Sequence, residues 1–270
     1  MYHLYEYDLK LRNSVIAMET LHIIESLVAV IFFALIFFFG PKSRLHWPGQ
    51  VYHRRFLSFA AGVSVAYVFI HLLPELHSAG VEFIHLTAHR SLLIPEYRVY
   101  MSALIGFMFF YGMEHMVAWS RLTRKKESLE EKTEKTEKTI YATHIGGFAI
   151  YAWLISYLLV YDTEKGTISL ILYAVAMGLH FLVIDYALYQ EHGSLYERRG
   201  KNVLALASLA GWVIAICIEL PAHIIITILG FVSGAVIMNS LINELPGEKE
   251  GKFPAFLLGG ILYAVLLLLI

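Results

Sequence analysis

Long apolar runs, separated by short breaks rich in Gly, Pro and charged residues, follow one another along the chain. A helix needs about 20 mainly apolar residues to cross the ~30 Å hydrocarbon core of a bilayer. Eight segments meet this requirement, at 14–40, 56–79, 98–120, 140–161, 166–190, 202–220, 223–245 and 253–270. Turn-like breaks separate them, among them Gly40-Pro41, 78–80, 162–166, 192–194, Pro221 and Pro246-Gly247. The pattern predicts an all-α polytopic membrane protein, with one transmembrane domain of eight helices over residues 1–270.

The amino-acid composition agrees with this prediction. Hydrophobic residues make up 58% of the chain and charged residues 16%, whereas soluble domains average about 45–50% and about 25%. The implied partner is the lipid bilayer, and a net charge of −1 gives no general basic surface for nucleic acid. The single cysteine, Cys217, excludes a disulfide within the chain, and its apolar neighbours predict a buried side chain.

Lysine and arginine are distributed unevenly between the two sets of loops. The first, third, fifth and seventh loops with their flanks hold 16 of the 21 Lys and Arg residues, and the other side holds five. Because cytoplasmic loops are enriched in positive charge, this asymmetry predicts that both termini lie outside. The cell membrane is the expected location. The third loop, 121–139, is rich in Lys, Glu and Thr, so we expect a charged cytoplasmic linker, partly helical through Glu–Lys pairs.

The second and seventh predicted helices share a sequence pattern. The segment AGVSVAYVFIHLLPE (61–75) aligns with SGAVIMNSLINELPG (233–247) at a constant offset of 172 residues. The two helices cross the membrane in opposite directions. Inverted repeats of this kind are typical of secondary transporters, and the alternative is chance similarity between two apolar segments. The repeat predicts a 3+2+3 arrangement, in which helices 1–3 and 6–8 are related by symmetry and helices 4 and 5 lie between them.

Together these features resemble the ZIP family of divalent metal transporters. The topology, the variable third loop and the 3+2+3 repeat match. AGVSVAYVFIHLLPE looks like the family's helix-2 signature, and SGAVIMNSLINELP is similar to its helix-7 counterpart. The resemblance covers the whole chain in topology and the two segments in local sequence. It implies transport of divalent metal ions, zinc or a similar first-row metal, towards the cytoplasm, and it implies a homodimer.

The metal motifs that the resemblance implies are incomplete. ZIP helix 4 carries an HNxxD-type motif and helix 5 an HExPHE-type motif, which together build a two-metal site. The fourth helix has no such motif, and its one histidine, His144, lies at the cytoplasmic end. The fifth helix has HFLVID (180–185), which keeps the first histidine, His180, and the final acid, Asp185. We therefore expect a divergent member in which the usual two-metal site does not form.

Histidines and carboxylates lie inside the predicted spans, where an ionisable side chain costs roughly 2.5–3.5 kcal/mol on insertion scales. A rise of ~1.5 Å per residue places Glu25, His71 and His180 within about 5 Å of the midplane. Imidazole and carboxylate ligands suit Zn²⁺ or a similar cation, whereas a Glu25–His71 pair could instead be a structural hydrogen bond. The residues predicted to contact the metal, which is the substrate, are His71, His180, Asp185, Glu25, His22 and Glu75.

Three functions fit these residues. The first is ZIP-like metal transport, in which the ligands act in turn and helices 1–3 and 6–8 move against helices 4 and 5. The second is an intramembrane metal-dependent hydrolase, in which Glu19, His22, Glu25, His71 and Glu75 hold one zinc that activates a water. The third is a transport-inactive metal sensor, for which the missing helix-4 motif argues. Because the inverted repeat is a transporter feature, we predict transport and no enzymatic activity.

Overall fold

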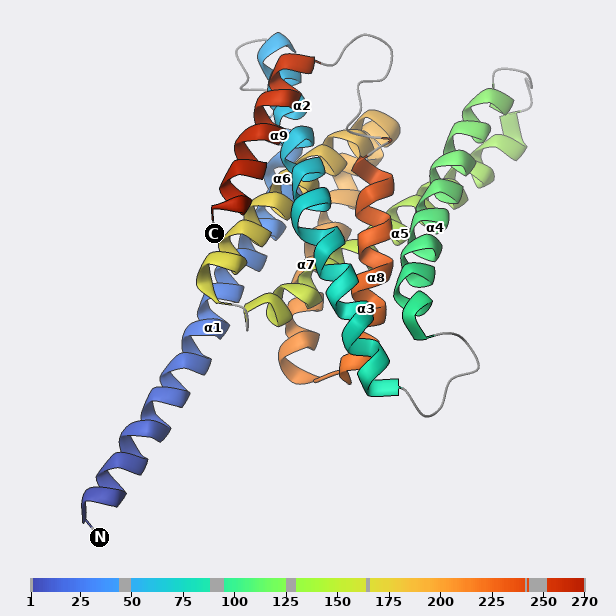
Figure 1. Cartoon of the computed structure of the whole chain (residues 1–270). Coiled ribbons are helices and arrows are strands. Elements are labelled where there is room, and N and C mark those ends of the chain that lie inside the picture. The colour runs from blue at the N-terminus through green and yellow to red at the C-terminus, as the bar shows by residue number, and fades with distance from the viewer. Residues whose placement is uncertain are drawn as a thin grey trace.

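Helices account for nearly all of the residues that the structure describes, which are 2–43, 50–87, 95–124, 130–163, 166–240, 242 and 252–269. In this computed structural model they are α1 (Tyr2–Ser43), α2 (Gln50–Tyr67), η2 (Val68–Leu72), α3 (Leu73–Thr87), α4 (Pro95–Arg124), α5 (Glu130–Thr163), α6 (Thr167–Leu195), η3 (Tyr196–Gly200), α7 (Lys201–Cys217), α8 (Ala222–Asn239) and α9 (Phe253–Leu268). The long helices form a bundle and run up and down in turn (Figure 1). The prediction of an all-α fold is confirmed.

Among the described residues, six stretches are long and apolar enough to cross a membrane. They are Thr20–Gly40, Arg54–Val81, Tyr97–Ser120, Lys138–Tyr161, Thr167–Cys217 and Ala222–Asn239. The fifth has 51 residues and contains Gly193, whose backbone is not helical (φ 53°, ψ −127°). The chain turns back there, so that α6 and α7 run in opposite directions (Figure 1). Eight crossings further require that α6 and α7 cross separately and that the 16-residue α9 crosses as well.

Large apolar side chains cover the outside of the bundle. Leu206, Phe253, Met108 and Phe69 each expose between 61% and 66% of their surface. In water such a surface would be strongly unfavourable, whereas lipid tails satisfy it, so the exposed surface agrees with an integral membrane protein. Cys217, at the end of α7, is also exposed. The prediction that it is buried is wrong, because its apolar neighbourhood belongs to the outer surface of the bundle.

Several helices extend beyond their predicted ends. The predicted turns at Gly40-Pro41 and 78–80 are both helical, because α1 continues to Ser43 and α3 to Thr87. In α3 the Ser78 hydroxyl donates to the carbonyl of Pro74 (3.1 Å), a bond that a serine makes inside a helix. The charged stretch 121–139 is helical up to Arg124 and again from Glu130, which agrees with the prediction of a partly helical linker.

Glycines allow two pairs of helices to approach closely, α2 with α9 and α4 with α8. A Cβ at Gly62 would overlap the Phe256 carbonyl oxygen on α9, and a Cβ at Gly234 would overlap the Ala103 carbonyl oxygen on α4. The partner helices α9 and α4 also place a glycine against the backbone of α2 and α8. A Cβ at Gly259 would overlap the carbonyl oxygen of Phe59, and one at Gly106 that of Phe231. Both Gly62–Gly234 and Phe59–Phe231 are 172 residues apart.

A widened turn interrupts the second predicted helix. Residues Val68–Leu72 form the π-helical turn η2, and the N–H of Leu73 donates to the carbonyl of Val68, five residues earlier. Pro74 follows, and its ring would press on the carbonyl four residues before it in a regular α-helix, so the wider turn relieves that clash. Ser240 is also π-helical and lies 172 residues after Val68.

Candidate functional site

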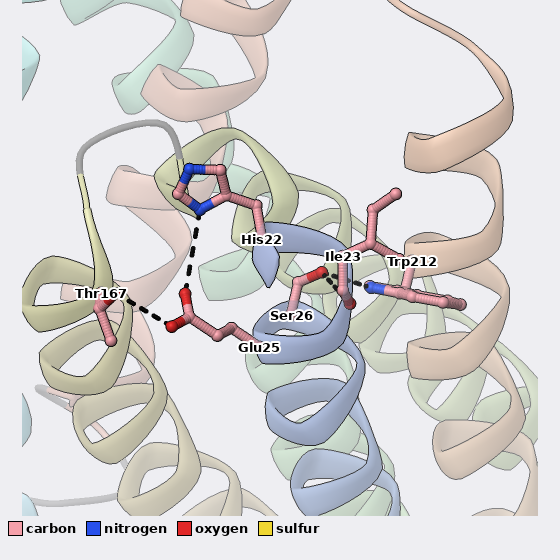
Figure 2. A network of polar contacts seen from close by, with 6 residues as sticks. All are labelled: His22, Ile23, Glu25, Ser26, Thr167 and Trp212. Carbon is pink, nitrogen blue, oxygen red and sulfur yellow. Dashed lines mark hydrogen bonds and ion pairs between the residues drawn. The ribbon is translucent and has the colours of Figure 1, made fainter. Parts of the chain in front are cut away.

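The first predicted ligand pair lies on α1, at the end of the bundle where α5 connects to α6. His22 Nδ1 and Glu25 Oε2 are 3.9 Å apart, and the hydroxyl of Thr167, at the start of α6, donates to Glu25 Oε1 (3.0 Å). Figure 2 shows the three side chains turned towards one another. Beside them Trp212 of α7 donates to the Ser26 hydroxyl (3.0 Å). Polar contacts therefore tie this part of α1 to both α6 and α7.

Two atoms of this pair remain unsatisfied. His22 Nδ1 and Glu25 Oε2 are buried, and neither has a hydrogen-bond partner among the described residues. Their 3.9 Å separation is too long for a hydrogen bond. Around a tetrahedral zinc with Zn–N and Zn–O bonds of ~2.0–2.2 Å, the two ligand atoms would lie roughly 3.3–3.5 Å apart. The pair supplies two ligands of suitable chemistry, at a spacing about half an ångström wider than a shared zinc requires.

The second predicted pair, His71 and Glu75, lies at the π turn. His71 Nε2 is 3.6 Å from Glu75 Oε2, and the rings of Tyr67 and His71 are stacked with centroids 5.0 Å apart. Glu75 also lines a small cavity of about 10 Å³, enough for about one water molecule, whose other walls come from α5, α6 and α8 and include Tyr161 and Met177. The cavity thus brings an acidic side chain to the place where the second and seventh predicted helices face the two middle ones.

His180 lies deep inside the bundle and already has a partner. It is 0% exposed, and its Nε2 is 2.9 Å from the hydroxyl of Tyr151 on α5. Tyr151 is itself buried among the rings of Phe110, Phe148 and Phe181. A metal that used His180 Nε2 would first have to displace the tyrosine hydroxyl.

Asp185 is also buried, one and a half turns further along α6. The Tyr196 hydroxyl donates to Asp185 Oδ1 (2.6 Å). From α1, Gly40 packs so closely that a Cβ there would overlap Asp185 Oδ2. A nearby contact joins α1 to the start of α7, because Lys201 Nζ donates to the Phe38 carbonyl (3.2 Å). The Asp185 carboxylate is therefore enclosed by α1 and the turn that follows α6.

The six predicted ligands are thus spread over several places in the bundle. In the part of the chain that the structure describes, no three His, Cys, Asp or Glu residues come together in a group that could hold a metal. The three-ligand zinc of the hydrolase alternative is not assembled from the described side chains of His22, Glu25 and His71. The side chain of Glu19, which belongs to the same alternative, lies outside the described residues. As it stands, the structure offers pairs of ligands rather than one complete site.

A further polar cluster was not predicted from the sequence. His144 Nδ1 lies 2.8 Å from His192 Nε2, and His144 Nε2 lies 3.1 Å from Glu114 Oε1. The three residues come from α5, α6 and α4, at the end of the bundle where α6 connects to α7. No short motif joins them. The sequence did contain one indication of this cluster. Glu114, His144 and the break at 192–194 all lie near the ends of predicted spans, on the same predicted side of the membrane.

Comparison with known proteins gives no family assignment. The chain matches no protein-family model, no curated protein and no solved structure. The resemblance to ZIP transporters therefore remains a hypothesis that depends on residues 61–75, 233–247 and 180–185.

Proposed function

We propose that this chain is a membrane transporter of divalent metal ions, with zinc or a similar first-row metal as substrate. The observation that carries the proposal is the matched packing of Gly62 on α9 and Gly234 on α4. Two equivalent glycines, 172 residues apart, make equivalent contacts with the helix that follows the partner segment. This is the arrangement expected of an inverted repeat, which is typical of secondary transporters.

The repeat is supported at two more points. The π turn at Val68–Leu72 has a counterpart at Ser240, which is also π-helical. In addition, α2 and α8 run in opposite directions through the bundle (Figure 1). We take α6 and α7 as separate crossings joined at Gly193, and α9 as the eighth. The result is a 3+2+3 arrangement in which α5 and α6 are the two middle helices.

The choice of a metal substrate rests on the chemistry of the buried pairs. The unsatisfied His22 Nδ1 and Glu25 Oε2 face each other 3.9 Å apart, and a small approach of the two side chains would let both bind one cation. Imidazole and carboxylate are the ligands that Zn²⁺ and its neighbours prefer. Two ligands at a time hold an ion weakly, and weak binding at several sites allows the ion to leave as well as to enter.

The pairs follow one another along the bundle. Counted along α6 at ~1.5 Å per residue, His180 lies about 20 Å beyond Thr167, which contacts Glu25, and Asp185 lies about 27 Å beyond it. An ion would pass from Glu25 and His22, through the cavity at Glu75, to His180 and Asp185. In this conformation His180 and Asp185 are hydrogen-bonded to Tyr151 and Tyr196, so the proposed path is closed at its centre. Movement of α5 and α6 against the other helices would open it.

The direction of transport follows from the charge distribution. Because 16 of the 21 Lys and Arg residues lie on one side of the predicted spans, we place the α6–α7 connection in the cytoplasm and both termini outside. The metal then moves from the α5–α6 end of the bundle towards the cytoplasm, in the cell membrane. A homodimer is part of this proposal through the ZIP resemblance.

The test is zinc influx into proteoliposomes, measured with an indicator trapped inside. Glu25→Gln and His180→Gln each remove one ligand, and we expect each to lower the initial influx about tenfold, which corresponds to a loss of ~1.4 kcal/mol in ion binding. The matched control is His115→Gln, because His115 is exposed on α4 and contacts Tyr111. Influx no greater than in empty liposomes, from folded wild-type protein, would refute the proposal.

A further inference from the structure

We propose that Glu114, His144 and His192 form a proton relay at the α6–α7 end of the bundle, and that this relay couples proton movement to metal transport. The coupling rests on the proposed function, whereas the relay itself rests on the geometry of the cluster. The three side chains form an unbroken chain of hydrogen bonds, from Glu114 through His144 (3.1 Å) to His192 (2.8 Å). Three separate helices supply them, so folding assembles the chain.

The chemistry of the groups fixes the position of each hydrogen. An ionised carboxylate can only accept, so His144 Nε2 must carry the hydrogen that it shares with Glu114. In a neutral imidazole the other nitrogen is then an acceptor. His144 Nδ1 therefore accepts, and His192 Nε2 must be the donor. All the hydrogen bonds point towards the carboxylate, which is the polarity that a relay delivering a proton to Glu114 requires.

One proton can cross this chain with all bonds accounted for. The proton binds to Nδ1 of His192, the nitrogen that carries no hydrogen in this tautomer, and the hydrogen on His192 Nε2 moves to His144 Nδ1. The hydrogen on His144 Nε2 then moves to Glu114 Oε1. Three bonds to hydrogen form and two break, so the cluster gains one proton, Glu114 becomes neutral and both imidazoles end as the opposite tautomer. The reverse sequence returns the proton.

The middle group of the relay is shielded, while its two ends are accessible. His144 is 3% exposed, whereas the side chain of Glu114 is 19% exposed and His192 is partly exposed. Among the described residues, the titratable and charged groups near the two histidines include Glu114 from α4 and Tyr141 from α5, whose ring meets that of His192 edge-on. Arg199 from η3 acts electrostatically on Tyr141. A proton must therefore enter through an end of the chain rather than at His144 directly.

The relay is joined to the centre of the bundle along one face of α5. His144, Phe148 and Tyr151 follow at spacings of four and three residues, which places them on the same side of the helix. The ring centroids of His144 and Phe148 are 5.2 Å apart, those of Phe148 and Tyr151 are 6.3 Å apart, and Tyr151 holds His180. A change of charge at His144 thus has a continuous packed route to the tyrosine that blocks His180.

The relay can be tested without any transport measurement. In protein labelled with ¹⁵N-histidine, the N–H···N hydrogen bond between His144 and His192 should give a proton resonance far downfield. Its two ring-nitrogen signals should change together when the pH is lowered, because one proton shifts the hydrogen of both rings. His144→Gln and His192→Gln should each abolish the shared resonance, and His115→Gln should retain it. Independent behaviour of the two rings, or no change with pH, would overturn the relay.

Coupling is tested in the same proteoliposomes used for zinc influx. Cleavage by a site-specific protease added outside identifies the orientation in which the protein is inserted. The readout is the ratio of influx at two pH values on the α6–α7 side, with the other side held constant. In the wild type we expect influx at the two pH values to differ by about fivefold or more, a typical size for coupled sites. Glu114→Gln should bring the ratio close to one while the histidine pair still gives its shared resonance, because the hydrogen-bonded pair remains but the proton acceptor is lost.

The outcomes separate the two proposals. Zinc influx that ignores pH on the α6–α7 side would overturn the coupling and leave transport standing. If no zinc moves but the two rings titrate together, the metal-transport proposal fails, and the cluster is supported as a proton-binding site. If influx by Glu114→Gln still differs between the two pH values as in the wild type, the pH response arises elsewhere, which also contradicts the relay.

Discussion

At the scale of single residues, two tyrosine hydroxyls are hydrogen-bonded to side chains that we propose as metal ligands. Tyr151 contacts His180, and Tyr196 donates to Asp185. Both tyrosines are buried, and a buried polar group is costly unless it is hydrogen-bonded. Each tyrosine therefore satisfies a polar side chain that would otherwise be left in an apolar surrounding when no ion is bound. Under the proposed transport function, the same contact would have to break for an ion to pass.

Tyr196→Phe removes the hydroxyl and keeps the ring. Because the lost hydrogen bond is short (2.6 Å) and buried, we expect the free energy of unfolding to fall by about 1–3 kcal/mol. Unfolding of the purified protein by denaturant in detergent measures this change. Tyr97→Phe is the matched control, since Tyr97 is 58% exposed. Equal stability of the two variants would show that the contact with Asp185 contributes nothing to the fold.

The order of His180 and Asp185 along their helix follows from the sequence, but their partners do not. Counting residues from a helix centre places a side chain along the membrane axis, because the rise per residue is constant. It does not say which neighbouring helix faces it. Tyr151 and Tyr196 lie 29 and 11 residues away from the groups they contact. The same limit explains why the contact between Glu114 and His144 was missed.

At the scale of helices, close packing depends on a few glycines. Without a hydrophobic drive between helices in lipid, small residues that let backbones approach are a main source of association. Gly62 and Gly234 each lie against backbone of the partner helix, which cannot move aside as a side chain can. These two positions therefore hold the pairs α2–α9 and α4–α8 together.

Gly62→Ala and Gly234→Ala should each lower the free energy of unfolding by about 1–3 kcal/mol, because the added methyl group is forced against backbone atoms. Since the two glycines lie in different helix pairs, the effects should add to within about 0.5 kcal/mol in the double variant. Unfolding in detergent measures all three changes.

The control for this prediction is Gly112→Ala together with Gly146→Ala. Nothing lies within 4 Å of a Cβ at either position. Alanine is the better helix former by up to ~1 kcal/mol, so these variants should be as stable as the wild type or more so. If all four substitutions had the same effect, the close contacts at Gly62 and Gly234 would not be the cause.

Helix positions were more predictable than helix ends. Apolar runs locate a span because the bilayer requires an apolar surface over a fixed length. The ends depend on whether the next polar residues continue the backbone hydrogen bonds, and outside the hydrocarbon they can do so at little cost. For this reason α3 continues past Ser78 and α5 begins at Glu130, inside stretches that composition assigned to a turn and a loop.

At the scale of the whole molecule, orientation and the number of crossings determine which way an ion would move. The helical stretch Thr167–Cys217 is 51 residues long, about 77 Å at ~1.5 Å per residue. This is more than twice the ~30 Å of hydrocarbon. One straight crossing would leave tens of ångströms of apolar helix in water, whereas a reversal at Gly193 places two helices in the membrane.

Single cysteines on either side of α7 test both points. Ser194 and Glu219 are exposed near the two ends of this helix, and Cys217→Ser supplies the cysteine-free background. If α7 crosses the membrane and the positive loops are cytoplasmic, an impermeant maleimide on intact cells should label Glu219→Cys and leave Ser194→Cys unlabelled. Inside-out vesicles should give the reverse. Labelling of both on one side would mean that α7 does not cross, which removes the eight-helix arrangement and the repeat with it. Exchanged labelling would keep eight crossings but invert the bundle, so that Glu114, His144 and His192 would face the outside.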